Sequence, residues 1–370
     1  MVQKTRIGLI GCGNISTIYL KNCARFENIR VTAVADIDST HAEAQAKAFD
    51  IPNVLTPREL IEGDKVDIIL NLTIPAAHAE VALQALENGK SVYNEKPLAT
   101  TRQDAAAMLE LAKKNGLRIG CAPDTFLGAA LQNARKLLDE GAIGTPVAAV
   151  AFMLCGGAES WHPNPYFFYQ TGGGPMFDMG PYYLTALTTL LGPVRRVTGS
   201  ARISSKQRVI GSEPHKGKLV DVEVPTHVAG LLDFASGPVG TVITSFDVPG
   251  KHHLPNIEIY GTGGSMRVTD PNTFGEDNIL LNAPGEKEWR SIPSPFGYAE
   301  QSRGVGLADM CRAIVSGRPH RANGSTAYHV LDIMHAIHEA SLAGAHIELK
   351  TDMVRPDPLP ENLTFGQLPD

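Results

Sequence analysis

Short apolar runs alternate with longer segments of helical spacing in the first third of the chain. The runs are rich in β-branched residues and predict strands over residues 6–10, 31–36, 66–72, 91–94 and 118–121. Between the third and fourth runs, residues 76–88 could cover one face of a sheet as a helix, which Gly89 then ends. Strands and helices that alternate in this way are typical of a doubly wound parallel sheet.

The pattern changes after Cys121. Residues 131–140 predict a helix closed by a glycine, and residues 226–234 and 240–246 alternate apolar and polar side chains. That alternation indicates an antiparallel sheet with one buried face. Apolar residues then recur at i, i+3, i+4 and i+7 from Leu307 and again from Val330, which predicts two amphipathic helices.

These changes divide the chain into two predicted domains and an arm. Residues 1–124 form the doubly wound α/β domain, and residues 125–350 form an α+β domain with a large, open, mostly antiparallel sheet. Residues 351–370 end in a proline-rich stretch without periodicity, which indicates an extended arm or a loose tail. A broad sheet leaves one face for helices or a second subunit, so we expect a homodimer or a homotetramer.

Composition narrows the class of protein. The 370 residues are 43% hydrophobic and 19% charged, as in ordinary globular proteins. The net charge of −6 argues against nucleic acid and anionic membranes as partners, because both call for a basic stripe that the sequence does not show. No apolar run approaches the length of a membrane-spanning helix, and the first residues do not resemble a signal peptide.

The cysteines are odd in number, scattered, and without paired spacing: Cys12, Cys23, Cys121, Cys155 and Cys311. This arrangement indicates free thiols in a reducing compartment and no structural zinc. We therefore expect a cytoplasmic protein without a bound metal.

A glycine-containing loop, Gly11-Cys12-Gly13-Asn14-Ile15-Ser16, joins the first predicted strand to a helix. The first glycine permits a tight turn, and the second lets the backbone approach a pyrophosphate, whose charge is met by N–H groups at the helix N-terminus. Ser16 replaces the usual third glycine and is still small enough for close packing of helix and strand. In this position the loop, with Asn14 and Ile15 at the helix start, predicts a dinucleotide site of the Rossmann type.

An acidic residue ends the second predicted strand. Asp36 lies 20 residues after Ser16, where a carboxylate can accept hydrogen bonds from the ribose hydroxyls of an adenosine. The carboxylate would repel a 2′-phosphate, and residues 37–41, beginning with Ile37, hold no lysine or arginine to compensate. Asp36 and Ile37 therefore predict NAD as the cofactor, with NADP disfavoured.

Two further groups of residues can handle protons. Lys96, in Glu95-Lys96-Pro97, follows the predicted strand 91–94 at the carboxyl edge of the sheet, where ligands bind in doubly wound folds. A lysine there can donate to a substrate hydroxyl and stabilise the alkoxide that develops as hydride leaves. Asp178 and Tyr182 follow a glycine run and are four residues apart, so on a helix they share one face as an acid/base pair.

Together these motifs resemble the Gfo/Idh/MocA oxidoreductases over residues 4–350. The matching pieces are the glycine loop, Thr73-Ile74-Pro75 with His78, Glu95-Lys96-Pro97, and the glycine run that ends in Asp178. The resemblance implies a Rossmann domain joined to an open-sheet domain. It also implies that Lys96 is the catalytic lysine, that Asp178 is its acidic partner, and that the cofactor site includes Thr73, Pro75, His78, Glu95 and Lys96.

The resemblance leaves the base open. Many family members have a histidine where this chain has Tyr182, and the branches with a tyrosine there use NADP, which conflicts with the prediction from Asp36. We follow Asp36, because its charge bears directly on the 2′-phosphate. A free phenol has a pKa of about 10 and would need a neighbouring cation such as Lys96 to ionise near neutrality.

His162 is a second candidate for the base, in a loop that could reach the pocket. A histidine beside a tryptophan is more often a packing or hydrogen-bonding residue, so His162 is also a candidate substrate contact. Trp161 could stack on a sugar ring or lie in the core. His252 and His253 follow Pro249 and Gly250, and their position alone suggests that they lie near the pocket.

These residues predict an enzyme that oxidises a secondary hydroxyl of a sugar, polyol or glycoside by hydride transfer to NAD, with Lys96, Asp178 and Tyr182 or His162 handling the proton. The same four residues and Trp161 are the expected substrate contacts. Two alternatives stay open: an enzyme that cleaves glycosides through transient oxidation, and a dinucleotide-sensing regulator without catalysis. The proton-handling groups favour an enzyme, because a sensor has no need of them.

Overall fold

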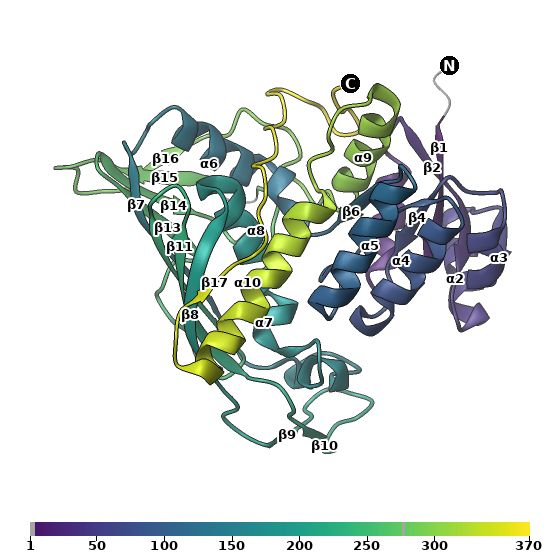
Figure 1. The fold of residues 1–370 in the computed structure, drawn as a ribbon, viewed down its shortest axis with the longest axis horizontal. Coiled ribbons are helices and arrows are strands. Elements are labelled where there is room, and N and C mark those ends of the chain that lie inside the picture. Colours follow the sequence, from purple (N-terminus) through teal and green to yellow (C-terminus); the bar gives the residue numbers. More distant parts are fainter. Residues whose placement is uncertain (1–3, 276–277) are drawn as a thin grey trace. The chain divides into compact units, whose positions relative to one another are not determined.

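The computed structural model describes residues 4–275 and 278–370 (Figure 1). They form two compact units. The first unit holds the described residues up to Ala129 together with residues 295–328 and 356–370, and the second holds residues 130–294 and 329–355. Within the described ranges, no helix has both the length and the apolar character needed to cross a bilayer.

A six-stranded parallel sheet forms the centre of the first unit, in the order β3-β2-β1-β4-β5-β6. The strands are β1 (Thr5–Ile10), β2 (Ile29–Ala35), β3 (Asn53–Leu55), β4 (Ile68–Asn71), β5 (Ser91–Asn94) and β6 (Ile119–Cys121). Five of them confirm the predicted strands. The edge strand β3 was not predicted, because its three residues are too short a run to stand out. The order reverses between β1 and β4, which is where doubly wound sheets bind ligands.

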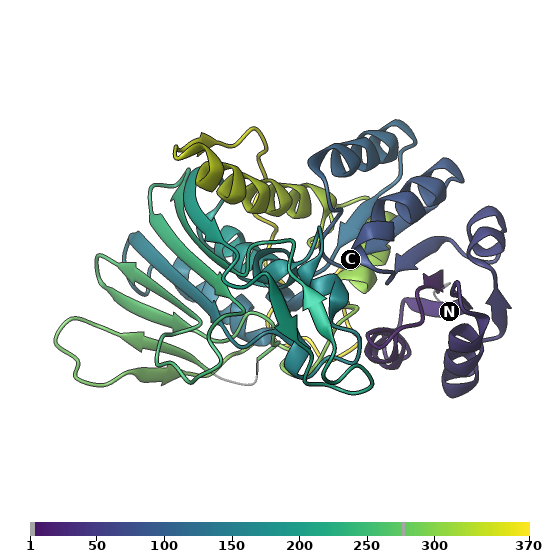
Figure 2. The ribbon, with the colours of Figure 1, turned by 90° about the horizontal axis from the view of Figure 1, so that it is seen from below.

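Helices cover both faces of this sheet: α1 (Ser16–Cys23), α2 (Ser39–Phe49), α3 (Pro57–Glu62), α4 (His78–Glu87) and α5 (Arg102–Lys114). Figure 2 shows α4 and α5 on one side of the sheet and α1 and α2 on the other. Side-chain oxygens of Asp38, Thr56 and Thr101 cap α2, α3 and α5, which fixes where these helices begin. By contrast, α1 has no side-chain cap, so its N-terminus is formed by the glycine loop.

The last two segments of the first unit come from the far end of the sequence. Helix α9 (Val305–Ser316) buries the apolar face predicted from Leu307, and the side-chain amide of Asn28 donates to its Ala308 carbonyl oxygen at 2.8 Å. The predicted boundaries at residues 124/125 and 350/351 treat each domain as one continuous segment. The first unit is instead discontinuous in sequence, since it includes α9 from the later part of the chain. The apolar face of α9 is buried within the first unit.

The C-terminal residues pack along the first unit as an arm and do not form a loose tail. Leu359 and Leu368 are buried, and the ring of Phe365 stacks on that of Phe26 with centroids 5.2 Å apart. Arg321 donates to the carbonyl oxygens of Asp357 and Pro358. An arm held by these contacts needs no helix or strand of its own, which is why its sequence shows no periodicity.

A nine-stranded sheet forms the second unit, in the order β16-β15-β14-β13-β7-β12-β11-β8-β17. The strands are β7 (Pro146–Leu154), β8 (Val194–Arg202), β11 (His227–Phe234), β12 (Val239–Ser245), β13 (Ile257–Gly261), β14 (Gly264–Val268), β15 (Ile279–Asn282), β16 (Arg290–Ile292) and β17 (Ile347–Glu348). Strands β7 and β12 pair in parallel, and the pairs around them are antiparallel. The predicted open, mostly antiparallel sheet is therefore confirmed.

Helices α8 (Gly180–Leu191) and α10 (Gly324–Ala343) pack on one face of this sheet, and helix α6 (Ala129–Asp139) precedes its strand β7. The fit of α10 is close, because a Cβ at Gly199 of β8 or Gly230 of β11 would lie 2.7 or 2.9 Å from the Ile337 side chain. Figure 1 shows α8 and α10 on one side of the sheet, and no helix of the described residues covers the other side. Leu231 and Val239 are exposed on that open face.

Candidate functional site

The glycine loop of the first unit has the backbone that the sequence predicts for it. Gly11 has a φ of +98°, and a Cβ there would lie 2.6 Å from the carbonyl group of Leu72. Only glycine fits this turn. Gly13 faces open space, since no atom lies within 4 Å of where its Cβ would be. The buried hydroxyl of Ser16 donates to the Gly13 carbonyl oxygen at 2.6 Å, so the residue in place of the third glycine helps to hold the loop.

Asp36 is held against this loop by both of its carboxylate oxygens. Oδ2 accepts the backbone N–H of Cys12 at 2.6 Å, and Oδ1 accepts that of Asp38 at 2.9 Å. The neighbouring Ile37 is 99% exposed, and Asn14 and Ile15 are also exposed at the start of α1. The loop backbone and the uncapped N-terminus of α1 therefore fit the pyrophosphate of a dinucleotide, and the oriented Asp36 carboxylate fits its ribose.

The structure gives His78 a role in joining two backbone segments. Its ring is fully buried, with Nδ1 2.7 Å from the Pro97 carbonyl oxygen and Nε2 3.0 Å from that of Thr73. Burial lowers the pKa of His78, so the neutral ring donates to one of the two carbonyl oxygens at a time. His78 therefore shapes the predicted cofactor site through the positions of Thr73-Ile74-Pro75 and Lys96-Pro97.

A second network fixes the turn that carries Lys96. The buried Glu95 carboxylate accepts the Tyr19 hydroxyl at 2.8 Å and the Lys96 backbone N–H at 2.8 Å, and the Lys96–Pro97 bond is cis. One residue before Glu95, the side-chain amide of Asn94 donates to the Leu98 carbonyl oxygen at 3.1 Å. The Lys96 turn is thereby anchored to α1 and to its own strand. Tyr19 and Asn94 gave no signal in the sequence, because a tyrosine on a helix and an asparagine on a strand are ordinary residues.

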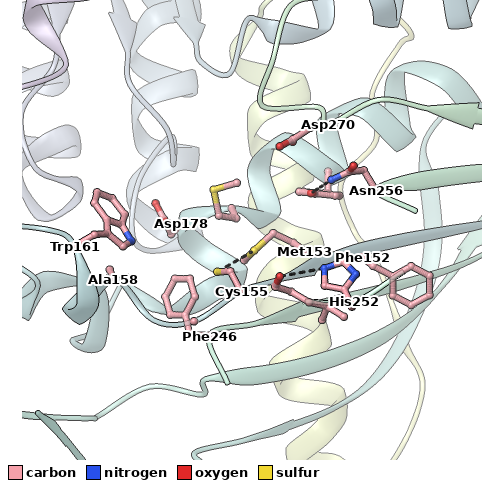
Figure 3. A pocket seen from close by; sticks show the side chains of 14 residues that line it. Phe152, Met153, Cys155, Ala158, Trp161, Asp178, Phe246, His252, Asn256 and Asp270 are labelled. Carbon is pink, nitrogen blue, oxygen red and sulfur yellow. Dashed lines mark hydrogen bonds between the residues drawn. The ribbon is translucent and has the colours of Figure 1, made fainter. Parts of the chain in front are cut away.

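A cavity of about 250 Å³ lies at the end of β7 in the second unit (Figure 3). Its polar and aromatic lining includes Cys155, Trp161, Asp178, Tyr183, Asn256 and Asp270. In Figure 3, Trp161 and Asp178 lie toward one side of the cavity and Asn256 and Asp270 toward the other. The second unit therefore brings Asp178 and Trp161, two of the predicted substrate contacts, into one small space.

Tyr182 does not line this cavity, and its neighbour Tyr183 does. The prediction that Asp178 and Tyr182 lie on one helix is wrong, because α7 (Gly174–Asp178) ends at Asp178 and α8 begins at Gly180. Tyr182 is only 7% exposed. The Tyr183 hydroxyl accepts a hydrogen bond from the Asn256 amide at 3.1 Å, and burial raises the pKa of Tyr183, so at neutral pH this phenol keeps its proton.

Trp161 lines the cavity with 65% of its surface exposed, while His162 lies beside it and is not a lining residue. The His162 ring packs edge-on against Trp161 and Phe168, and its Nδ1 accepts the Asn164 backbone N–H at 3.0 Å. Burial lowers the pKa of His162. In the neutral ring the proton is then on Nε2, so His162 is better suited to donate a hydrogen bond than to act as a base.

An ion-pair network supports the segment that carries Trp161. The Arg208 guanidinium of β9 (Gln207–Val209) pairs with Glu159 at 3.0 Å and with Asp247. The Tyr169 hydroxyl donates to Glu159, and the Thr226 hydroxyl donates to Asp247 at 2.8 Å. These contacts join residues 159–169 to the sheet beneath them and so define one wall of the cavity.

Several lining residues gave no signal in the sequence. Phe246, Asn256 and Asp270 follow β12, precede β13 and follow β14, and nothing in their spacing shows that these strand ends meet. His252 was suggested by its position after Pro249 and Gly250, and it does line the cavity, with Nε2 3.2 Å from the Leu154 carbonyl oxygen. His253 is not a lining residue.

Two-domain oxidoreductases have a dinucleotide-binding sheet in one domain and a polar pocket in the other. This chain has both features, with two carboxylates in the pocket of its open-sheet domain. Residues 5–122 match the model described as "Oxidoreductase family, NAD-binding Rossmann fold", and residues 131–267 match the GFO/IDH/MocA C-terminal domain. The chain belongs to the Gfo/Idh/MocA family of oxidoreductases. The resemblance predicted from the motifs is thus confirmed.

Similar proteins include several sugar and polyol dehydrogenases. The chain is 26% identical over 289 residues to the scyllo-inositol 2-dehydrogenase (NAD⁺) of Bacillus subtilis, covering 77% of this chain and 79% of that protein. It is 26% identical over 353 residues to the levoglucosan dehydrogenase of Pseudarthrobacter phenanthrenivorans, covering 85% and 88%. A solved structure of levoglucosan dehydrogenase without ligands superposes with a TM-score of 0.83 over 95% of this chain and 100% of that one, at 22% identity.

Proposed function

We propose that this protein is a dehydrogenase that oxidises a secondary hydroxyl of a sugar, polyol or glycoside, with NAD as the hydride acceptor. The observation that carries the proposal is the cavity of the second unit, where the Asp178 carboxylate, the Trp161 indole and the Asn256 amide face one small space. Carboxylates and amides can bind neighbouring hydroxyls, and an aromatic ring can cover the apolar face of a sugar ring. Relatives named for inositol and levoglucosan act on the same class of substrate.

The first unit supports NAD as the cofactor. When bound, NAD supplies a nicotinamide ring that accepts hydride at its C4. Gly11 and Gly13 let the loop backbone approach the pyrophosphate, and Asp36 accepts from the ribose hydroxyls while it holds the Cys12 and Asp38 N–H groups. NADP is disfavoured, because its 2′-phosphate would meet the fixed negative charge of Asp36.

Lys96 and Asp178 are the proton-handling residues of this proposal. The Lys96 ammonium donates to the reacting oxygen and stabilises the developing alkoxide, while the Asp178 carboxylate orients the substrate and accepts the hydroxyl proton as hydride leaves. Tyr182 and His162 are weaker candidates for the base. The first is buried outside the cavity lining, and the acceptor nitrogen of the second already holds an N–H group.

We propose further that a second copy of the chain covers the open face of the sheet in the second unit, as a homodimer or homotetramer. Exposed Leu231 and Val239 lie on this face beside the Arg196–Asp233 ion pair, a mixture of apolar surface and charge found in subunit interfaces. Leu231→Lys should then lower the mass measured by sedimentation. The five cysteines are free, which supports the proposed cytoplasmic location.

The test is the formation of NADH, followed by absorbance, with purified protein, NAD or NADP, and a panel of aldoses, inositols and glycosides. We expect NADH with at least one member of the panel and with NAD in preference to NADP. Lys96→Ala should reduce the rate by more than about 100-fold, because removing a group that stabilises transition-state charge has effects of that size. The matched control is Lys113→Ala, on an exposed lysine of α5, which should leave the rate unchanged.

Three outcomes would contradict the dehydrogenase. If NAD binds tightly and nothing in the panel is oxidised, the proposed reaction is wrong. Release of an aglycone from a glycoside without net NADH would identify an enzyme that cleaves by transient oxidation. A partner protein that binds only in the presence of NAD, without turnover, would identify a regulator.

A further inference from the structure

The cavity of the second unit has an acidic lining. Two of its lining side chains are carboxylates, Asp178 and Asp270, and the other polar ones are Cys155, Tyr183, His252 and Asn256. Among the described residues that line it there is no lysine or arginine. Sugar acids and sugar phosphates are usually bound by arginine or lysine, which pair with the carboxylate or phosphate.

The layer behind the cavity adds to this negative charge. Glu159 and Asp247 share the single guanidinium of Arg208, so this network keeps an excess negative charge next to the wall that carries Trp161. The effect is visible at a lining thiol. Burial and the charges of Asp178 and Glu159 together raise the pKa of Cys155 to about 11, against the smaller opposing effect of Arg208.

Asp270 holds its carboxylate in a defined place on one side of the cavity. It follows β14, its Oδ1 accepts the Asn272 N–H at 2.9 Å, and its carbonyl oxygen accepts the Thr273 hydroxyl at 2.8 Å. After burial, the charge of Asp270 is the main cause that raises the pKa of Tyr183, whose hydroxyl accepts from Asn256. Asp270, Asn256 and Tyr183 therefore form one polar wall, and Figure 3 shows Asp178 and Trp161 toward the other side.

We propose that this pocket selects polyols that carry no negative charge, that it prefers an amino-substituted sugar or cyclitol over the neutral parent, and that Asp270 is the residue that sets this preference. The inference rests on the proposed dehydrogenase and names the chemical class of its substrate. A carboxylate is an acceptor only, so it binds hydroxyls and ammonium groups alike. An ammonium gains in addition from the two lining carboxylates, whose charge the single Lys96 ammonium of the proposed reaction offsets only in part, whereas a carboxylate or phosphate on the substrate is repelled.

The experiment compares kcat/KM for matched substrates that differ in one substituent: a neutral aldose or cyclitol, its amino derivative, the corresponding uronic acid and the 6-phosphate. The wild-type enzyme with saturating NAD should turn over the amino compound at least as well as the neutral one. The uronic acid and the phosphate should be at least about 100-fold poorer, which corresponds to about 2.7 kcal/mol. Salt up to about 1 M should narrow these ratios, because it screens charge.

Asp270→Asn then tests the residue, since the amide keeps the shape and removes the charge. We expect the preference for the amino compound over the neutral one to fall about tenfold and the uronic acid to improve relative to the neutral compound by a similar factor. The control is Glu288→Gln, which removes one negative charge from an exposed side chain of the same unit and should change neither ratio.

Two results would overturn the inference: efficient oxidation of the uronic acid or the phosphate by the wild-type enzyme, or unchanged ratios in a folded Asp270→Asn variant. The wild-type series decides the charge selectivity even if that variant does not fold. A different result, tight NAD binding without oxidation of any polyol of any charge, would contradict the proposed dehydrogenase itself.

Discussion

Glu95 holds two residues from different parts of the first unit with its two carboxylate oxygens. One oxygen accepts the Tyr19 hydroxyl of α1, and the other accepts the backbone N–H of Lys96. Since α1 begins at the glycine loop, this carboxylate links the predicted pyrophosphate site to the predicted catalytic lysine. The position of the Lys96 backbone therefore depends on a buried tyrosine that acts through the Glu95 carboxylate.

Tyr19→Phe should lower kcat about tenfold with little change in the KM for NAD. The substitution removes one hydrogen bond to a charged, buried carboxylate, an interaction of about 1.5–3 kcal/mol, and leaves Glu95 free to shift the Lys96 turn. Steady-state kinetics with NAD measures the split between kcat and KM. Equal losses of NAD affinity and of kcat would instead indicate general damage to the domain, and unchanged kcat would exclude a positioning role for Tyr19.

Asp36 is the residue that should decide the cofactor. In Asp36→Ser the negative charge is removed and the Cys12 N–H loses a 2.6 Å acceptor. We expect the KM for NAD to rise about tenfold, because the ribose hydroxyls lose the Asp36 carboxylate as acceptor. The KM for NADP should fall, because removing one charge that opposes the 2′-phosphate is worth about 1 kcal/mol or more near a protein surface. Kinetics with both cofactors measures the change. An unaltered NAD-to-NADP ratio would show that other residues discriminate the 2′-phosphate.

At the scale of elements, the segment with Trp161 and His162 depends on a side chain from a separate hairpin. Arg208 lies on β9, which pairs with β10 (Leu219–Asp221), and it reaches Glu159 below Trp161 and Asp247 after β12. The segment itself contains only short turns of 3-10 helix, at Ala158–Ser160 and Tyr166–Tyr169. Turns of this length are not stable alone, so side-chain contacts set their position.

Arg208→Met should lower the free energy of unfolding by about 3 kcal/mol, since it leaves two largely buried carboxylates facing each other without a cation. We also expect KM for the polyol to rise by more than kcat falls, because the wall with Trp161 loses its support. Urea unfolding and steady-state kinetics measure the two effects. Arg202→Met, on an exposed arginine of β8, is the control and should change neither.

At the scale of the whole molecule, each unit is assembled from segments far apart in the sequence. In the first unit the fully buried Asp309 of α9 pairs with Arg318 and Arg321, and Arg321 holds the arm at Asp357 and Pro358. Between these arginines His320 donates from Nε2 to the Ile119 carbonyl oxygen of β6 at 2.9 Å. The loop after α9 is thus fixed to the central sheet.

This arrangement predicts a pH-dependent stability. Burial, with smaller effects of Arg118 and Arg318, lowers the pKa of His320 from 6.5 to about 4, against the opposing effects of its hydrogen bond to the Ile119 backbone and of the Asp309 charge. Between these two values the unfolded chain binds more protons than the folded one. The contribution of His320 is therefore complete above about pH 6.5 and is lost as the pH falls toward 4, by up to about 1.4 kcal/mol per pH unit.

His320→Gln should remove this dependence, so its stability relative to the wild type should improve steadily from pH 6.5 to pH 4.5. Asp124, whose pKa burial raises to about 6, changes stability in the opposite direction with pH, but it is present in both proteins. The difference between the two urea unfolding curves at each pH therefore isolates His320. A difference that stays constant across this range would contradict the prediction.

Features that depend on neighbours along the chain could be predicted from the sequence. The period of apolar residues predicted the parallel sheet, because a strand or helix must bury one side. The glycine loop follows the first predicted strand, Asp36 ends the second, and Lys96 lies just after the strand over residues 91–94. The carboxyl ends of parallel strands meet at one edge of their sheet. Their grouping in the first unit could therefore be predicted, whereas Tyr19 could not, since its contact with Glu95 crosses 76 residues.

The cavity of the second unit depends on contacts between residues that are far apart in the sequence, so it could not be predicted. Asp178 could be predicted from its motif, but a break between α7 and α8 puts Tyr183 in the lining where helical spacing favoured Tyr182. Asn256 and Asp270 reach the cavity because antiparallel pairing of β13 with β7 and β14 brings distant strand ends together. The physical reason is the same in each case. Strand register and helix ends decide which side chains meet across a sheet, and both depend on the packing of the whole unit and not on local spacing.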